Sequence, residues 1–420
     1  MLNKFKFIDL FCGIGGFHQA MKSLGGECVF ASDIDKHCQN TYEKNYNLRP
    51  IGDITKVKEE DIPEFDVLCG GFPCQTFSVA GKRLGFDDPT KGTLFFDIIR
   101  IMKYHKPKYA LLENVKNLAS HDDGNTWRVI YETLTEIGYT VLKEPIVFSP
   151  HYIGIPQLRE RVFIMCVRKD IEDTIPQFYF NHNNIKPCSM NTILQDDSEV
   201  DSKYNLSDDY IKLLEHWNRF ILNVNKDEPE VPGFSIWDEY LCECDVEHEL
   251  SQCLPYREPI IRKCKELYLN NKDFIDKWHK DGKSVSEFNS IRTRLEWQCN
   301  KDRKTANIWN YFIQFRQSGI RVKEATFFPT LVAMNQTSII GPKKRYITPR
   351  ECARLQSFPD TFIMDENEAQ AYKQFGNSVN VECIKLFAKY MFGDKETRKE
   401  YSFAVQYPNE LPDITSYELF

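Results

Sequence analysis

Short apolar runs alternate with amphipathic stretches over about the first 170 residues of the chain. Strands are predicted at 6–11, 28–32, 66–69, 109–113 and 162–167, because these runs are short, apolar and bounded by glycine or polar residues. Stretches such as 17–24, 94–102 and 126–137 repeat apolar positions at helical spacing. Strands that alternate with helices favour parallel βαβ units. The chain is therefore predicted to be an α/β protein with a doubly wound, mostly parallel, Rossmann-like sheet.

The alternation stops near residue 171. Aromatic and polar residues then follow one another without a clear period until about residue 329, and a helical pattern returns at 351–355 and after 379. We therefore predict a first domain at 1–186, a smaller domain at 187–341 whose fold the pattern does not predict, a return to the first domain at 342–400, and a C-terminal tail at 401–420.

The composition is that of a globular protein. The 420 residues are 42% hydrophobic and 27% charged, and no apolar run is long enough for a signal peptide or a membrane span. We expect a soluble, cytoplasmic protein whose 14 cysteines are reduced thiols. The net charge of −7 argues against a protein that binds nucleic acid over its whole surface, but it is compatible with a local basic patch that binds DNA.

A glycine-rich turn joins the first predicted strand to a helix at residues 12–16. Such a turn lets a ligand approach the backbone at a helix N-terminus, and Asp33 or Asp35, after the second strand, could accept hydrogen bonds from ribose hydroxyls. The glycine spacing departs from G-x-G-x-x-G, which disfavours a dinucleotide oxidoreductase. On this motif alone, a tight turn with a purely structural role stays open.

Two other predicted strands end in side chains that can do chemistry. The strand at 66–69 leads into Gly-Gly-Phe-Pro-Cys at 70–74, and the strand at 109–112 leads into Glu113. Because the carboxyl ends of strands line the ligand crevice of an open α/β sheet, Cys74 and Glu113 are expected on the same edge as the glycine turn. Most single cysteines are small buried apolar residues. A cysteine that shares this edge with a carboxylate is a candidate nucleophile.

Five segments in order resemble the motifs of bacterial cytosine-5 DNA methyltransferases. Phe-Pro-Cys-Gln at 72–75 resembles the nucleophile motif, Glu-Asn-Val at 113–115 the motif that holds the base, and Gln-Leu-Arg-Glu-Arg at 157–161 the Gln-x-Arg-x-Arg element. The segments at 347–356 and 374–379 resemble the late helix motif and the motif that closes the cofactor pocket. The resemblance covers about the first 170 and the last 75 residues.

The resemblance implies S-adenosylmethionine as the methyl donor. Asp33 would hold its ribose, Ile34 would lie against the adenine where some relatives carry tryptophan, and Asp53 would accept from the adenine amino group. The residues expected to form the cofactor site are Phe11, Ile14, Gly16, Asp33, Ile34, Asp53, Ile54, Phe72, Pro73, Leu94, Asn377 and Ser378.

The resemblance also implies a covalent mechanism on a cytosine that is flipped out of duplex DNA. Cys74 would add to C6 and thereby activate C5 toward a methyl sulfonium. Glu113, protonated because burial raises its pKa, would donate to N3. Arg161 would bind O2 and Arg159 would help to order the site.

Two regions are expected to contact DNA. The segment 81–92 has glycines at both ends, and its Lys82, Arg83 and Lys91 would close over DNA as a lid, with an ordinary solvated loop as the alternative. Segment 187–341 would recognise the target sequence. Its basic residues gather at 292–323, where a solvated charged face is the alternative, and Thr330 would approach a phosphate.

Other interpretations are less consistent with the sequence. An RNA cytosine methyltransferase would carry a shorter variable segment, and an inactive relative would lack some of Cys74, Glu113, Arg161 and Asn377, all of which are present. Cys242 and Cys244 suggest zinc, but their spacing favours structural thiols, and we expect no metal. The expected partner is duplex DNA. Family analogy adds a cognate restriction endonuclease, and we expect a monomer.

Overall fold

The computed structural model describes residues 4–73, 94–175, 178, 188–281, 290–331, 338–393 and 398. They pack as two compact units: unit 1 comprises 1–194, 330–334 and 349–420, and unit 2 comprises 195–329 and 335–348. The predicted boundaries at 186 and 341 thus differ from those of the compact units. Side chain to backbone hydrogen bonds account for part of the difference, because Arg354 donates to the carbonyls of Ile193 and Leu194, and Thr330 donates to that of Leu158.

Unit 1 is built on a sheet in which, within the described residues, seven strands take part. Four of them lie in the order β2-β1-β3-β4 and run parallel, and β8 follows antiparallel to β4, with β5 and β6 both antiparallel to β8. The strands are β1 Phe5–Leu10, β2 Gly26–Ser32, β3 Val67–Gly71, β4 Tyr109–Val115, β5 Tyr139–Val141, β6 Ile146–Phe148 and β8 Arg161–Arg168, and a short strand, β7 Gln157–Leu158, precedes β8.

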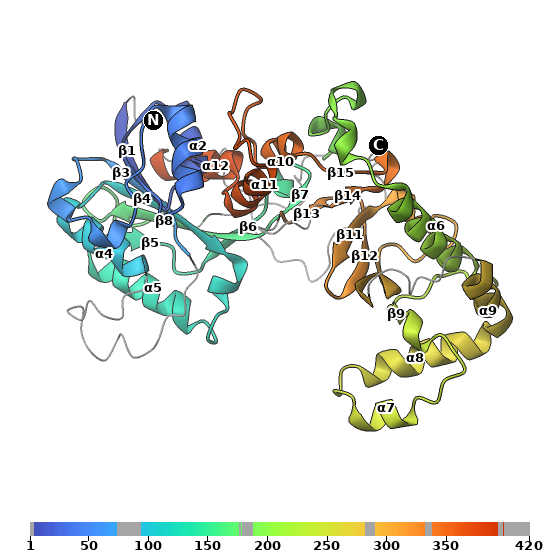
Figure 1. Ribbon diagram of the computed structural model, residues 1–420. Coiled ribbons are helices and arrows are strands. Elements are labelled where there is room, and N and C mark those ends of the chain that lie inside the picture. The colour runs from blue at the N-terminus through green and yellow to red at the C-terminus, as the bar shows by residue number, and fades with distance from the viewer. Residues whose placement is uncertain are drawn as a thin grey trace. The chain divides into compact units, whose positions relative to one another are not determined.

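Helices cover both faces of this sheet, as the side chains of β8 show. Val162, Ile164 and Cys166 belong to the apolar cluster that includes α4 and α5, whereas Phe163, which points the other way, stacks on Phe387 of α12 with 4.4 Å between ring centroids. Figure 1 shows these layers within the unit. The helices of unit 1 are α1 Gly16–Ser23, α2 Lys36–Tyr46, α4 Leu94–His105, α5 Asn125–Glu136, α10 Pro349–Leu355, α11 Glu368–Asn377 and α12 Val381–Phe392.

The doubly wound α/β fold predicted from the sequence is confirmed, and each of the five predicted strands corresponds to an observed one. The prediction that the strand at 162–167 continues the parallel series is wrong. This strand lies in β8, which is antiparallel to β4. The reason is the connection before it, because β6 and β8 pair antiparallel and turn the chain back on itself.

Unit 2 combines a second sheet with four helices among its described residues. The strand order is β15-β14-β11-β12-β10-β9, and β10 is parallel to β12 while the other pairs are antiparallel. The strands are β9 Ser235–Trp237, β10 Arg294–Gln298, β11 Phe312–Arg316, β12 Gly319–Lys323, β14 Ile339–Ile340 and β15 Arg345–Tyr346, with a further short strand β13 Phe328–Pro329. The helices are α6 Asp208–Asn223, α7 Glu247–Gln252, α8 Glu258–Asn270 and α9 Lys272–Asp281.

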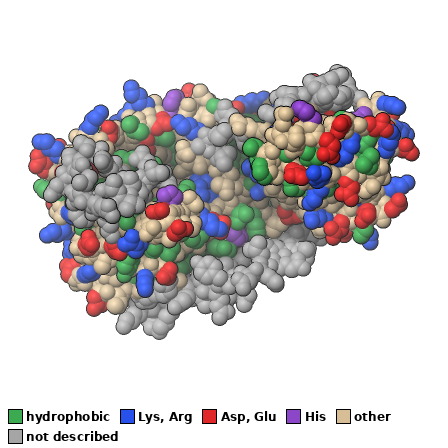
Figure 2. All heavy atoms as spheres, turned by 90° about the horizontal axis from the view of Figure 1, so that it is seen from below, with side chains coloured by type: hydrophobic (Ala, Val, Ile, Leu, Met, Phe, Trp, Pro, Cys, Tyr) green, Lys and Arg blue, Asp and Glu red, His purple; other side chains and the backbone are tan. Residues whose placement is uncertain are grey.

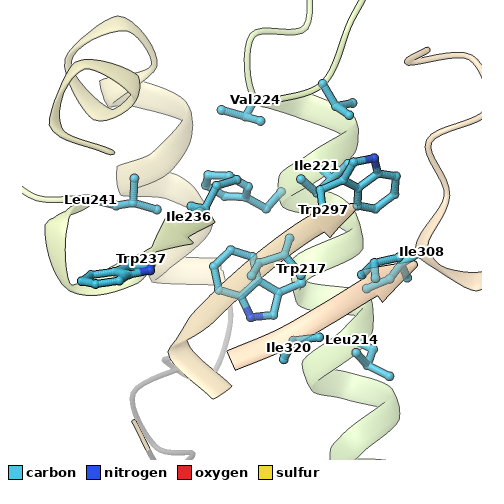
Figure 3. Close-up of a cluster of buried hydrophobic side chains, with 14 of the residues drawn as sticks. Leu214, Trp217, Ile221, Val224, Ile236, Trp237, Leu241, Trp297, Ile308 and Ile320 are labelled. Atoms are coloured by element: carbon cyan, nitrogen blue, oxygen red, sulfur yellow. The ribbon is translucent and has the colours of Figure 1, made fainter. Parts of the chain in front are cut away.

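The core of unit 2 forms around α6. Trp217 of this helix is fully buried, and Figure 3 shows it among apolar side chains that come from the helix and from the strands, such as Ile236 and Ile320. Its indole N–H donates to the carbonyl of Arg292 at 3.2 Å, so the buried polar atom of the ring has a partner. The sequence pattern had predicted no fold for this region. The structure shows that its scattered tryptophans, Trp217, Trp237, Trp278, Trp297 and Trp309, belong to one core.

On the face shown in Figure 2, lysine and arginine side chains are interspersed with acidic ones. Among the residues that the structure describes, no helix is long and apolar enough to cross a membrane.

The expectation of reduced thiols is wrong at one place: Cys242 and Cys244 form a disulfide. The tight turn between them brings their Cα atoms to 5.3 Å, within the range of a disulfide.

Candidate active site

The candidate site residues of unit 1 gather where neighbouring strands end. Leu10 of β1 is the register partner of both Ser32 and Gly70, and Gly71 of β3 is the partner of Glu113 in β4. The glycine turn therefore follows β1, the segment that leads to Cys74 follows β3, and Glu113 lies near the end of β4. These three strands are adjacent and parallel. The sequence predicted this shared edge, and the pairing of β1, β3 and β4 shows how it is built.

Buried Glu113 and partly buried Arg161 form an ion pair at this edge. Arg161 begins β8, and its Nε lies 3.1 Å from Oε1 of Glu113, whose residue is 8% exposed. Burial raises the pKa of Glu113 above its ordinary value, although the positive charges of Arg161 and Arg159 oppose the increase. The carboxyl group thus holds its proton more tightly than an exposed glutamate does. It can serve as a hydrogen-bond donor at a pH where most carboxyl groups are ionised.

Arg159 connects segments that are far apart in the chain. It is 2% exposed, and its guanidinium donates to the carbonyls of Leu331 at 3.0 Å, Gly376 at 2.9 Å and Ser378 at 2.8 Å. Burial, followed by repulsion from Arg161, lowers the pKa of Arg159 to about 9. The side chain remains mostly protonated near neutral pH. It therefore holds the 374–379 motif and residue 331 beside the strand edge.

Val379, held by this arrangement, lies against two glycines of the candidate site. A Cβ on Gly16 would lie 2.6 Å from Cγ2 and 3.0 Å from the carbonyl oxygen of Val379, so this position accepts only glycine without movement. A Cβ on Gly71 would lie 3.7 Å from Cγ1 of Val379 and 3.6 Å from Oε2 of Glu113. The glycine turn, the end of β3 and Glu113 are therefore parts of one packed site.

The glycine turn is held by Asp33. Gly13 and Gly15 adopt left-handed conformations with φ of 51° and 86°, and Asp33 accepts hydrogen bonds from the amides of Gly13 at 2.7 Å and Asp35 at 2.8 Å. Burial raises the pKa of Asp33, while these two amides oppose the increase. Asp35 instead caps α2, where its carboxylate accepts from the amides of His37 and Cys38. The two acidic candidates thus have different tasks, and Asp33 is the one at the turn.

The other candidate cofactor residues differ in exposure. Phe11, Ile54, Phe72 and Leu94 all belong to or pack against a single apolar cluster, and Ile14 is also buried. Ile34, in contrast, is 75% exposed.

The polar and terminal candidates surround this apolar surface. Asp53 accepts from the amide and hydroxyl of Thr55, and its segment is joined to the end of β2 by the hydrogen bond from the Asp33 amide to the Ile51 carbonyl. Ser378 is buried, whereas Pro73 and Asn377 are exposed. No group of three or more His, Cys, Asp or Glu side chains in the described ranges is arranged to hold a metal ion.

Several predicted site residues lie outside the described residues. These are Cys74, which follows Pro73 in the sequence, and Lys82, Arg83 and Lys91 of the predicted lid. Thr330 is described, and its hydroxyl donates to the carbonyl of Leu158 at 2.7 Å, next to Arg159 in the sequence. The roles assigned to these residues stay predictions.

The structure adds two residues that were not among the predicted site residues. Asn114 donates from Nδ2 to the carbonyl of Phe72 at 2.9 Å, which ties the segment before Cys74 to the end of β4. The hydroxyl of Tyr46 donates to the carbonyls of Ile14 at 3.2 Å and Gly15 at 3.0 Å and supports the glycine turn from α2. Asn114 could have been suspected as the residue after Glu113 at a strand end. Nothing in the sequence around Tyr46 indicates its partner.

Comparison with known proteins assigns this arrangement to a family. A family model described as C-5 cytosine-specific DNA methylase matches residues 5–393. The chain belongs to the C-5 cytosine-specific DNA methylase family. It is an enzyme, a DNA cytosine-5 methyltransferase, and the predicted family and activity are confirmed.

The relatives of this methyltransferase cover most of its length. Type II methyltransferase M.HhaI of Haemophilus parahaemolyticus is 33% identical over 400 residues, which cover 95% of this chain and 98% of the relative. Type II methyltransferase M1.ScrFI of Lactococcus lactis subsp. cremoris is 37% identical over 401 residues, covering 94% and 80%. A solved Escherichia coli structure, provisionally assigned as a prophage-encoded DNA modification methyltransferase, covers 94% of this chain and 99% of its own at 19% identity and a TM-score of 0.51, and it supports the fold alone.

Replacing Arg159 by methionine should destabilise the methyltransferase. The change leaves three backbone carbonyls without their donor, two of them buried, and we expect the free energy of unfolding to fall by about 3 kcal/mol or more in urea titrations followed by circular dichroism. Arg128→Met is the matched control, because Arg128 lies on the exposed side of α5, and it should change the free energy by less than about 0.5 kcal/mol. Equal effects of the two changes would contradict the role given to Arg159.

Proposed function

We propose that the enzyme transfers a methyl group from S-adenosylmethionine to C5 of a cytosine flipped out of a short, specific duplex DNA site, through a covalent adduct between Cys74 and C6. The observation that carries this proposal is the ion pair of buried Glu113 with Arg161, beside the segment that leads to Cys74. One group of this pair can donate a proton and the other is a permanent cation. The two groups suit a cytosine ring on which negative charge develops at N3 and O2.

The chemistry of cytosine requires such a pair. C5 is a poor nucleophile until a thiolate adds across C6, and negative charge then develops on N3 and O2. Glu113 in its protonated form would donate to N3, and Arg161 would donate to O2. After methyl transfer, loss of the C5 proton and departure of the Cys74 thiolate restore the ring. The target base must leave the stack, because these groups cannot reach it inside a duplex.

The described residues fit S-adenosylmethionine as the donor. When bound, it supplies an electrophilic methyl group on a sulfonium. The carboxylate of Asp33, which accepts from the amide of Gly13 at the turn, would accept from ribose hydroxyls, and the exposed side chain of Ile34 next to it would offer an apolar surface for the adenine ring. Asp53 would accept from the adenine amino group. Phe11, Ile14, Gly16, Ile54, Phe72, Pro73, Leu94, Asn377 and Ser378 would complete the pocket.

DNA contacts are assigned to both units. Lys82, Arg83 and Lys91 would neutralise phosphates from the segment 81–92, Thr330 would approach another phosphate, and the domain predicted at 187–341 would recognise the base sequence. Because the relatives are Type II methyltransferases, we assign the enzyme a protective role beside a restriction endonuclease. The proposed enzyme acts as a monomer in the cytoplasm.

Labelled methyl transfer tests the substrate. With S-adenosylmethionine labelled in its methyl group, we expect incorporation into duplex DNA and none above background into tRNA, because the family resemblance leads us to expect a shorter variable segment than 187–341 in an RNA-directed enzyme. Incorporation into tRNA alone would contradict the proposed substrate and favour RNA methylation.

Replacing Cys74 by serine separates chemistry from binding. A serine hydroxyl is not ionised near neutral pH, so we expect methylation to fall below detection, at least about a thousandfold, while calorimetric affinity for S-adenosylmethionine changes by less than about threefold. Cys253→Ser, at a partly exposed thiol of unit 2, is the control and should retain full activity. An equal loss of cofactor affinity in Cys74→Ser would mean that this residue serves folding and not catalysis.

The rate of methylation should depend on the protonation of Glu113. Its pKa is raised from 4.5, so the protonated form required for donation to N3 is lost as the pH rises through that raised value. Single-turnover rates should therefore show a falling limb toward high pH, and Glu113→Gln, whose amide donates but does not titrate, should be slower and lack this limb. Linkage has the same sign: the stability that comes from tighter proton binding is present at low pH and lost as Glu113 ionises. An unchanged falling limb in Glu113→Gln would contradict this role.

A further inference from the structure

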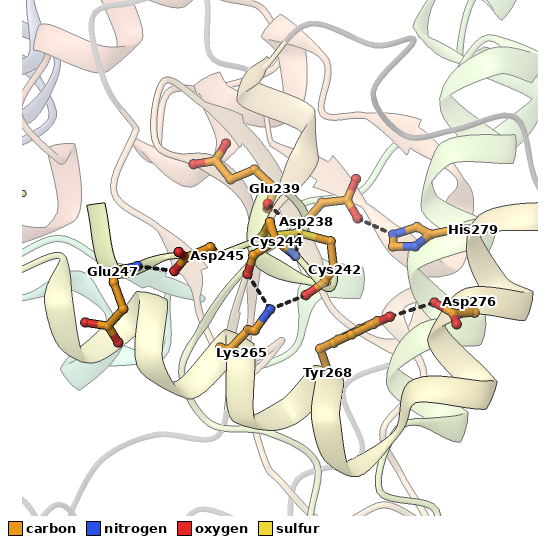
Figure 4. Close-up of a disulfide and its surroundings, with 10 residues drawn as sticks. All are labelled: Asp238, Glu239, Cys242, Cys244, Asp245, Glu247, Lys265, Tyr268, Asp276 and His279. Atoms are coloured by element: carbon orange, nitrogen blue, oxygen red, sulfur yellow. Dashed lines mark hydrogen bonds and ion pairs between the residues drawn. A yellow bond between two sulfur atoms is a disulfide. The ribbon is translucent and has the colours of Figure 1, made fainter. Parts of the chain in front are cut away.

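The disulfide between Cys242 and Cys244 lies in a turn of unit 2 that takes no part in the proposed chemistry. The turn follows a short 3-10 helix at Asp238–Tyr240 and precedes α7 (Figure 4). Leu241 and Val246, on either side of it, are buried in the core of the unit. The two apolar residues hold the ends of the turn, while Glu243 and Cys244 between them are exposed.

The exposure of Cys244 distinguishes it from the other cysteines of unit 2, of which Cys253 and Cys299 are partly exposed. Cys244 is exposed and Cys242 is partly exposed. Cys264 lies in the same core cluster, and burial raises its pKa to about 11, so its thiol stays protonated near neutral pH. Exposed disulfides are the ones that small thiols can attack, whereas buried thiols are chemically inert. The Cys242–Cys244 bridge is therefore accessible to exchange.

A lysine from α8 holds the turn in its closed form. Nζ of Lys265 donates to the carbonyl of Cys242 and to that of Cys244, both at 2.6 Å (Figure 4). The carbonyls of Cys242 and Cys244 can both accept from the one ammonium group of Lys265 only if the backbone turns sharply between them. Glu243, the residue at the bend, forms an ion pair with Lys272 at the start of α9. Cations of two helices thus stabilise the backbone shape in which the two sulfurs meet.

We propose that Cys242 and Cys244 are a thiol–disulfide exchange site whose reaction partners are low-molecular-weight disulfides of the glutathione type, with Lys265 as a positioning residue. The Cys244 thiolate attacks the small disulfide, forms a mixed disulfide and releases one small thiolate. The Cys242 thiolate then attacks the sulfur of Cys244 and releases the second. The protein dithiol loses two electrons and two protons, and the small disulfide is reduced to two thiols.

Energetics explain why the turn geometry matters. A bridge between residues two positions apart closes a very short loop, so it restricts the unfolded chain little. Its formation depends instead on how well the folded turn presents one sulfur to the other. The hydrogen bonds from Lys265 stabilise that presentation, and their loss should favour the dithiol.

Trapping of the mixed disulfide tests which cysteine reacts first. In the full-length Cys242→Ser variant incubated with oxidised glutathione, peptide mapping by mass spectrometry should find the glutathione adduct on Cys244. The Cys244→Ser variant, whose remaining thiol at Cys242 is less exposed, should carry several-fold less adduct. Absence of adduct from both variants would overturn the proposal, and equal or greater modification of Cys242 would overturn the order of attack.

Redox equilibration of the intact protein tests the site and the lysine together. At a series of glutathione ratios, alkylation and mass spectrometry should show the wild-type pair converting reversibly between dithiol and disulfide. Lys265→Met should shift the midpoint toward the dithiol by about tenfold, because a charge-assisted hydrogen bond is lost. Lys265→Arg, which keeps the donors, should restore most of the shift.

Lys263→Met is the matched control, because it removes the same charge from the same helix. Nζ of Lys263 lies 5.7 Å from the ring centroid of Phe234. It should leave the midpoint within about twofold of the wild type. Thiols that stay unpaired at every glutathione ratio would overturn the exchange site. Equal shifts for Lys265→Met and Lys263→Met would overturn the positioning role.

Discussion

The buried guanidinium of Arg159 is the constraint on which the rest of the site depends. A cation with 2% exposure must be matched by acceptors, and three backbone carbonyls from residues 331, 376 and 378 supply them. Because those residues are distant in sequence, the guanidinium determines where the C-terminal part of unit 1 docks. Val379 then packs on Gly16 and Gly71, which closes the glycine turn against the strand edge.

The same cation affects the chemistry proposed for its neighbours. Burial raises the pKa of Glu113, and the positive charges of Arg161 and Arg159 oppose this increase. The carboxyl group can therefore either form an ion pair with Arg161 or hold a proton. In the ion-paired form, Arg161 is engaged by the protein. On protonation of Glu113 that pairing weakens, and both side chains become available to a base. The proposed role of the pair thus depends on the balance between burial and two positive charges.

Much of unit 1 could be predicted because its signals are local. Apolar runs, the glycine turn and the residues at strand ends predicted the shared edge of Gly13, Glu113 and the segment before Cys74. The direction of β8 could not be predicted, because an apolar run reads the same in a parallel and an antiparallel strand. The partners of Arg159 could not be predicted either, because they are carbonyls, which every residue has. In unit 2, β10 pairs with β12 although β11 lies between them in the sequence, and no local pattern indicates such a pairing. The disulfide was missed because an argument from cellular compartment does not consider turn geometry.

Site-resolved bisulfite sequencing of duplex DNA treated with the purified enzyme and S-adenosylmethionine would show whether the enzyme methylates cytosine at a specific site. The result we predict is that one cytosine within a short recurring sequence resists conversion, and that cytosines elsewhere convert as they do in untreated DNA. Complete conversion of every cytosine, under conditions in which the protein is folded and binds the cofactor, would contradict the account.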